Sequence, residues 1–142
     1  MRLALAELPG AEIAVIHDAA RPLLTRELVE ACIAEVRAGW DGAIAAALVT
    51  DTVKEADAAG RVVRTLDRSG LWAIQTPQAF RADALRAALE VDAAALADAT
   101  DDAVLVEAAG GSVRVVEAPR ENLKVTVPFD LRLAEQLLSG RC

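Results

Sequence analysis

Several residue types that mark common protein classes are scarce in this chain of 142 residues. Its two cysteines, Cys32 and Cys142, cannot build a disulfide framework and are compatible with a reducing compartment. No apolar run approaches the roughly 18 residues of a membrane span. The first ten residues include Glu7 and lack a small-residue cleavage site, so they make a poor signal peptide. We therefore expect a cytoplasmic protein without a membrane segment.

The motifs of several enzyme classes are also lacking. The chain has one histidine, and no set of cysteines and histidines resembles a zinc site. No Gly-Xaa-Ser-Xaa-Gly sequence provides a nucleophile elbow. The net charge of −7 disfavours non-specific binding to nucleic acid or to acidic membranes. An anionic ligand would have to be bound by local basic residues or by a cation.

Small aliphatic residues are abundant, since the chain is 54% hydrophobic and only 3% aromatic. Length and composition predict one domain, residues 1–142, with a single core. Short apolar runs predict strands at 11–16, 42–49, 71–75, 112–118 and 122–127. Helical spacing of apolar residues predicts helices between Thr25 and Gly39, over 81–90, after Asp101 and from Pro128 onward.

The order of these elements predicts an α/β fold. The first two strands are joined by a helix and short links, so we expect them to form a parallel pair with a right-handed crossover. The sequence TPQ at 76–78 is expected to turn the chain.

Residues 51–68 differ in character from the rest of the chain. Two short segments that alternate polar and apolar residues, 52–57 and 61–66, flank the sequence AAG, which indicates a hairpin. Charges lie on both sides of this arm, so it cannot be buried in the core. We expect it to project and to contact a partner.

The stretch IHDAARPLL, residues 16–24, contains the first candidate site. A buried strand ends at Asp18, and ligands of open α/β sheets bind beyond the carboxyl ends of strands. A carboxylate there can hold a divalent cation. The alternative is that Asp18 caps a turn and that Arg21 is a solvated surface charge. His17 is expected to be a structural side chain with its hydrogen bonds satisfied, not a catalytic base.

The other candidates also have structural alternatives. Lys124 can be an outward-facing strand lysine, and Arg68 can be a turn arginine. Thr76 can be a hydroxyl at a strand end, and Asp101 and Asp102 can cap a helix.

Five segments, taken together and in order, resemble one family. IHDAARPLLT, VTDTVK, LDRSGLWAIQTPQAF, TDDAVLVEAAGGSVRVVEA and RENLKVTVPFDL are similar to the 2-C-methyl-D-erythritol 4-phosphate cytidylyltransferases of the non-mevalonate isoprenoid pathway. The resemblance runs from about Ile13 to Leu138. It implies a nucleotide-diphospho-sugar-transferase-like (Rossmann-like) fold, with a mostly parallel sheet, helices on both faces and a homodimer formed through the β-arm 51–68.

The family transfers CMP from CTP to 2-C-methyl-D-erythritol 4-phosphate and releases pyrophosphate, with Mg²⁺ or another divalent cation. The resemblance places Asp18 near the metal and the nucleotide phosphates. It also implies that the Ala19 backbone meets the ribose and that Arg21 supports this loop.

The remaining positions match residues that bind the sugar phosphate. The resemblance assigns this binding to Thr52, Arg68, Thr76, Thr100, Asp101 and Lys124. Thr52 and Arg68 would reach the pocket across the dimer, and Lys124 would bridge the two substrates. The resemblance implies that Arg68 and Lys124 are the catalytic residues and hold the attacking phosphate.

Two features depart from the family. The glycines of this sequence form no phosphate-cradling loop, so we expect 1–142 to be a domain truncated at its N-terminus. Such a domain would carry mainly the sugar-phosphate half of the site. We therefore expect it to turn over CTP negligibly by itself. Val127 stands where the family usually has a threonine or serine cap. The rival interpretations are a ribitol 5-phosphate cytidylyltransferase and a non-catalytic dimerisation or phosphosugar-binding module.

Overall fold

A computed structural model describes residues 2–91 and 99–140. The helices are α1 (Arg2–Ala6), α2 (Arg26–Arg37), α3 (Ala82–Ala88), α5 (Asp102–Ala108) and α6 (Pro128–Ser139). The strands are β1 (Ile13–Ile16), β2 (Gly42–Leu48), β3 (Lys54–Ala56), β4 (Val62–Thr65), β5 (Trp72–Arg81) and β6 (Val113–Glu117). No helix among the described residues is long and apolar enough to cross a membrane.

The main sheet has four strands in the order β1-β5-β2-β6. β5 pairs antiparallel with both β1 and β2, while β6 pairs parallel with β2. Three strands therefore run in one direction and β5 runs against them, which confirms the α/β class. The expected direct pairing of the first two strands is wrong, because β5 is long enough to lie between them and pair with both.

β5 continues through the sequence where a turn was expected. Its register with β2 shifts between Ile44 and Ala46, so three residues of β5 lie opposite one residue of β2. A bulge of this kind tolerates a proline, which cannot donate to the ladder. Pro77 therefore lies within a strand, and the predicted turn at 76–78 is wrong.

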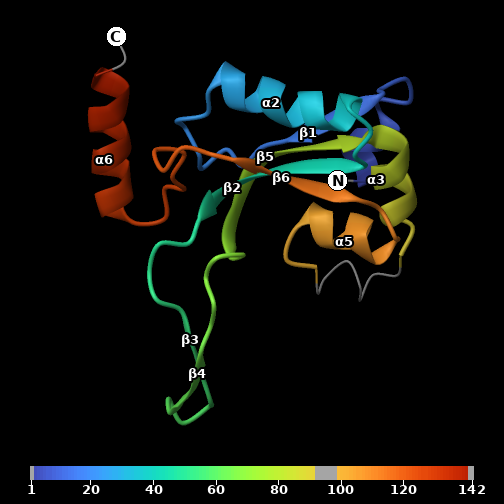
Figure 1. The fold of residues 1–142 in the computed structure, drawn as a ribbon. Helices are drawn as coiled ribbons and strands as arrows, with labels where there is room; N and C mark the ends of the chain where they lie inside the picture. Colours follow the sequence, from blue (N-terminus) through green and yellow to red (C-terminus); the bar gives the residue numbers. More distant parts are fainter. Residues whose placement is uncertain (1, 92–98, 141–142) are drawn as a thin grey trace.

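Helices cover both faces of the sheet (Figure 1). On one face α2 packs Leu28, Cys32 and Val36 against the alanines of β2 and β5. Its first turn is capped by Thr25, whose Oγ1 accepts a hydrogen bond of 3.3 Å from the backbone N–H of Leu28. The alternation of side chains along β2 sends Ile44 to the opposite face.

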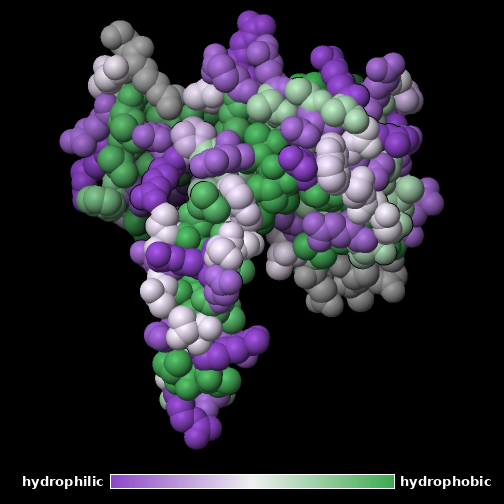
Figure 2. Space-filling model, in the orientation of Figure 1, coloured by the Kyte–Doolittle hydropathy of each residue, from purple (hydrophilic) through white to green (hydrophobic). Residues whose placement is uncertain are grey.

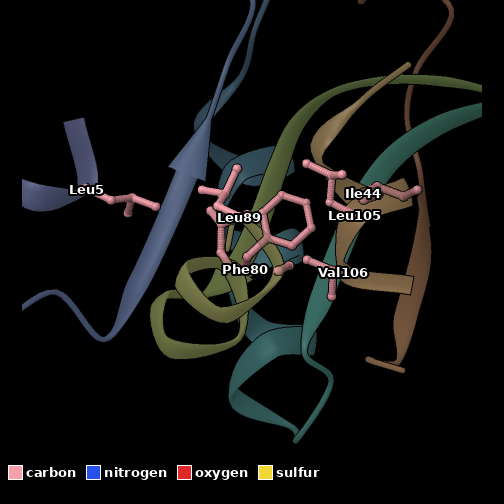
Figure 3. Packing of buried hydrophobic residues seen from close by; sticks show 9 residues of the cluster. Leu5, Ile44, Phe80, Leu89, Leu105 and Val106 are labelled. Carbon is pink, nitrogen blue, oxygen red and sulfur yellow. The ribbon is translucent and has the colours of Figure 1, made fainter. Parts of the chain in front are cut away.

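On the opposite face the core is built around Phe80, which is fully buried among residues of α1, α3 and α5 (Figure 3). Burying a phenylalanine side chain contributes about 1.5–3 kcal/mol. Gly42 makes room for the ring, because a Cβ at this position would lie 2.6 Å from Cδ1 of Phe80.

β3 and β4 form a two-stranded antiparallel sheet that projects from the body of the molecule (Figure 1). The expected hairpin at 51–68 is thereby confirmed. Its turn is stabilised by Asp57, whose Oδ1 accepts the backbone N–H of Ala59 and Arg61, each at 3.0 Å. Gly60 adopts a φ of +79°, which favours glycine. Figure 2 shows that the arm carries both polar and hydrophobic residues on its surface.

The segment before α6 is a loop, not a strand. No ladder forms over 122–127, and the backbone N–H of Val125 instead donates to the carbonyl of Ala20 at 2.8 Å. Val127 has an extended backbone at the N-cap of α6 and provides no side-chain cap. The carboxylate of Asp130 accepts the backbone N–H of Thr126 and of Val127 instead, at 2.9 and 3.1 Å.

Candidate active site

A pocket of about 330 Å³ lies beyond the end of β1, beside the bulge of β5. Its lining comes from the loop after β1, from β5, from the start of α5 and from the loop before α6. The lining residues are Asp18, Arg21, Ile74, Gln75, Thr76, Gln78, Thr100, Asp101 and Lys124. The structure therefore brings together six of the predicted site residues, from four separate segments of the sequence.

Asp18 is held by several hydrogen bonds at the end of the strand. Its Oδ1 accepts the backbone N–H of Ala20 at 3.0 Å, and its Oδ2 lies 2.8 Å from Nζ of Lys124. The hydrogen bond from Lys124 and that from the Ala20 backbone hold the pKa of Asp18 below its usual value. Asp18 thus caps a turn, as the structural alternative expected, and also presents a charge to the pocket.

Arg21 is partly buried, so its interpretation as a solvated surface charge is wrong. Its Nη1 donates to the backbone carbonyl of Asn122 at 2.7 Å. Its Nε is buried without a hydrogen-bond partner in the structure. Burial lowers the pKa of Arg21, and the charge of Asp18 acts in the opposite direction.

Lys124 lies in the loop before α6, so the alternative of an outward-facing strand lysine is also wrong. Half of its side-chain surface is exposed. The backbone hydrogen bond from Val125 to Ala20 places the loop of Lys124 against the loop that carries Asp18. Two basic groups, Lys124 and Arg21, are therefore available at one pocket of an acidic protein.

His17, which follows β1, contacts Thr76 of β5. Oγ1 of Thr76 accepts the backbone N–H of Asp18 at 2.9 Å and lies 3.1 Å from Nδ1 of His17. Nε2 of His17 lies 2.9 Å from the carbonyl oxygen of Arg21. Both ring nitrogens of His17 have a partner, which confirms the expected structural side chain.

Asp101 combines a structural role with a place in the pocket. Its Oδ1 accepts the backbone N–H of Val104 at 3.0 Å and so caps α5, which confirms the expected helix cap. Its Oδ2 accepts a hydrogen bond of 3.3 Å from Nε2 of Gln78. Thr100, just before it, is exposed in the same pocket. Asp102 does not line this pocket, and burial raises its pKa.

Three amide side chains were not singled out from the sequence. Asn122 is 1% exposed, and its Nδ2 donates to Oε1 of Gln75 and to the carbonyl of Thr76, each at 2.8 Å. Gln78 is 3% exposed and donates to the backbone of Gln75 as well as to Asp101. The available signal was two glutamines, Gln75 and Gln78, that lie three residues apart in one strand, because buried amides need partners.

The remaining predicted residues lie elsewhere. Thr52 and Arg68 are exposed at the base of the arm and do not line the pocket. The guanidinium Nη1 of Arg68 donates to the backbone carbonyl of Thr50. Ala19 is exposed beside Asp18.

Within the described residues, no group of three or more histidine, cysteine, aspartate or glutamate side chains is placed to hold a metal ion. The pocket has two carboxylates, Asp18 and Asp101. One oxygen of Asp18 is engaged by Lys124, and the oxygens of Asp101 accept hydrogen bonds from Val104 and Gln78. The residues that line this pocket could therefore supply only a few of the ligands of a hard divalent cation. Its other ligands would have to be water or phosphate oxygens, as is usual for Mg²⁺.

The comparisons with known proteins agree on one family. The model of the 2-C-methyl-D-erythritol 4-phosphate cytidylyltransferase family matches residues 2–140. The chain is 51% identical to the enzyme of that name from Rubrobacter xylanophilus over 91% of this chain and 55% of the relative. It is 48% identical to the one from Nocardia farcinica, over 99% of this chain and 60% of the relative.

A crystal structure of 4-diphosphocytidyl-2C-methyl-D-erythritol synthase from Anaerococcus prevotii superposes with a TM-score of 0.85 and 33% identity, covering 97% of this chain and 62% of that one. The fold is thus the nucleotidyltransferase-like α/β fold of that structure. The chain belongs to the 2-C-methyl-D-erythritol 4-phosphate cytidylyltransferase family. It spans about half to three-fifths of the length of the curated relatives it matches.

Proposed function

We propose that this chain carries the sugar-phosphate half of a site that transfers CMP from CTP to 2-C-methyl-D-erythritol 4-phosphate. The observation that supports this most directly is the pocket, which combines two cationic groups with hydroxyl and carboxylate groups. Lys124 suits the phosphate of the sugar phosphate, and Arg21 suits a phosphate on the nucleotide side. Thr76, Thr100 and Asp101 suit the hydroxyls of a polyol.

The chemistry requires positioning and charge neutralisation more than it requires a strong base. An oxygen of the sugar phosphate attacks the α-phosphorus of CTP, a new P–O bond forms, and the bond to the β-phosphate oxygen breaks to release pyrophosphate. Both reactants are anions and repel each other, so cationic groups that hold them in line lower the barrier. Lys124 would hold the attacking phosphate from within the subunit.

Lys124 must exchange partners for this role. In the structure its ammonium group is paired with Asp18 at 2.8 Å. A phosphate that enters the pocket would compete for the same group. Asp18 would then be free to contribute a carboxylate oxygen to Mg²⁺ or another divalent cation, which would spread the charge of the triphosphate when bound. Ala19 and Arg21 would contact the nucleotide side.

The arm would complete the site in a homodimer. Thr52 and Arg68 lie outside the pocket of their own chain, on an arm that projects from the body (Figure 1). In a two-fold dimer each arm can reach the other subunit, and both sites are then equivalent. Arg68 would supply the second cation at the attacking phosphate.

The test is direct binding of sugar phosphates, measured by calorimetry. We expect 2-C-methyl-D-erythritol 4-phosphate to bind more tightly than ribitol 5-phosphate, and Lys124→Ala to weaken this binding by about ten- to a hundredfold. The matched control is Lys54→Ala, since Lys54 is the other lysine of the chain and pairs with Thr65 on the arm. Equal loss in both variants would contradict the assignment of the pocket.

The same titrations separate the rival functions. Preference for ribitol 5-phosphate would favour the ribitol 5-phosphate cytidylyltransferase. Tight binding of a sugar phosphate that added CTP leaves unchanged would favour a non-catalytic binding module.

A further inference from the structure

His17 has two hydrogen-bond contacts, and together they specify which nitrogen carries a hydrogen. Its Nε2 lies 2.9 Å from the carbonyl oxygen of Arg21. A carbonyl oxygen can only accept, so Nε2 must be the donor. In a neutral imidazole the other nitrogen, Nδ1, is then an acceptor.

The partner of Nδ1 is the hydroxyl of Thr76, at 3.1 Å. This hydroxyl has one hydrogen and two lone pairs. One lone pair accepts the backbone N–H of Asp18 at 2.9 Å. The hydrogen can therefore point at Nδ1 of His17, and a single lone pair of Thr76 is left for other contacts.

These bonds form a chain with one direction. With a hydrogen on Nε2 and none on Nδ1, the N–H of Asp18 donates to Thr76, Thr76 donates to His17, and His17 donates to the carbonyl of Arg21. A further hydrogen bond within the loop after β1 runs from the backbone N–H of Arg21 to the carbonyl of Asp18, at 2.9 Å. One imidazole thus connects the two charged residues that the loop brings to the pocket.

We propose that His17 is a positioning residue, which as the neutral Nε2–H tautomer orients the hydroxyl of Thr76 and so fixes the backbone of Asp18 and Arg21. It touches no reacting group. Its importance for substrate binding rests on the function proposed above. Because the hydrogen of Thr76 is turned toward the imidazole, Thr76 offers a ligand only an acceptor, which suits a hydroxyl of the substrate and not its phosphate.

The first experiment reads the tautomer directly. The chain has one histidine, so ¹⁵N-histidine labelling gives the spectrum of one ring. In mildly alkaline buffer we expect a hydrogen on Nε2 and an acceptor-type Nδ1. A hydrogen on Nδ1, an imidazolium pattern or two averaged tautomers would each overturn the proposal, and no variant is needed for this result.

The second experiment tests the link to Thr76. Thr76→Val should shift the Nδ1 resonance and speed hydrogen exchange of the Asp18 amide at least about threefold, since one hydrogen bond is lost. Thr76→Ser should retain both wild-type values. The matched control is Thr126→Val, because the hydroxyl of Thr126 donates to Asp130 outside the pocket. An unchanged ring spectrum in Thr76→Val would contradict the link.

The third experiment separates the two contacts of the ring. In His17→Asn the side-chain amide lies near the former Nδ1 and can still accept from Thr76. In His17→Gln it reaches toward the former Nε2 and can still donate to the carbonyl of Arg21. We expect the Asp18 amide to stay protected in His17→Asn and to exchange faster in His17→Gln.

Equal hydrogen-exchange rates of the Asp18 amide in His17→Asn and His17→Gln would overturn the positioning role of His17. Binding of 2-C-methyl-D-erythritol 4-phosphate to the same variants distinguishes the two proposals. Failure of the wild-type chain to bind it refutes the proposed function alone, because the ring spectrum and the amide exchange need no ligand. If the wild type binds, we expect His17→Gln to lose more affinity than His17→Asn, and the reverse order would refute the connection between His17 and the pocket.

Discussion

Arg68 and Lys124 allow a test of whether the arm acts across a dimer. Each is changed to alanine in a separate chain, and binding of 2-C-methyl-D-erythritol 4-phosphate is measured for each variant alone and for their mixture. Lys124 lines the pocket, whereas Arg68 lies at the base of the projecting arm. If the arm reaches the neighbouring subunit, each site draws one of these residues from each chain.

The expected losses follow from the contacts. A hydrogen bond to a charged group contributes roughly 1.5–3 kcal/mol, which corresponds to about one to two powers of ten in Kd. Arg68→Ala should lose this amount. Lys124→Ala should lie at the upper end of this range, because it also leaves the carboxylate of Asp18 unpaired beside the incoming phosphate. A second change, Asp18→Asn, should recover part of the loss in Lys124→Ala.

Mixing the two single variants should restore some high-affinity sites. In a two-fold dimer that contains one chain of each kind, one site lacks both residues and the other has both. Random exchange of subunits makes about half of the dimers hybrid, so about a quarter of the wild-type number of tight sites should appear. Calorimetry gives this number as the stoichiometry of the tight phase.

Subunit exchange must be shown independently, for example by energy transfer between two dye-labelled populations. Exchange without any tight sites in the mixture would refute the reasoning. The arm would then act within its own chain or would not contribute to the pocket. Tight binding by Arg68→Ala alone would equally remove Arg68 from the site.

Three further predictions concern the fold. Gly42→Ala should lower the free energy of unfolding by about 1–3 kcal/mol in urea denaturation, since its Cβ would lie 2.6 Å from the buried Phe80 ring; Gly70→Ala, with open space around it, is the control. Burial raises the pKa of Cys32 to about 11, so in a Cys142→Ser background alkylation near neutral pH should be slow until the chain is unfolded. Val127→Thr should stabilise the chain by about 1 kcal/mol in thermal unfolding, because the extended N-cap of α6 lacks a side-chain acceptor.

The sequence was most informative where a local pattern determines local structure. The helical spacing before Gly39 predicted α2 and its cap, and the charged segments around Gly60 predicted the arm. Asp18 could be placed beyond the end of a strand, where the structure has a pocket, because an apolar run that ends in a charge marks the edge of a sheet.

The order of the strands could not be read from such patterns. Local alternation says nothing about which strand lies beside which, and Pro77 argued against a continuous strand where a bulge accommodates it. The loop at 122–127 has the composition of a strand, but its backbone bonds to Ala20 instead of to a ladder. Tertiary contacts decided both cases. The buried amides of Gln78 and Asn122 were missed for the same reason, since their partners come from distant segments.

The contacts around Asp18 also connect anion binding to cation binding. In the structure Lys124 neutralises Asp18, and its hydrogen bond is the main reason that the pKa of Asp18 is lowered. A phosphate that takes Lys124 leaves the carboxylate without its cation, so a divalent cation near Asp18 becomes more favourable. By reciprocity, Mg²⁺ should then strengthen binding of the sugar phosphate. We expect calorimetric titrations with and without Mg²⁺ to differ in Kd, and we expect Asp18→Asn to remove most of this difference. If the wild-type chain bound the sugar phosphate with the same affinity with and without Mg²⁺, the coupling would be contradicted, and so would a role of Asp18 in metal binding.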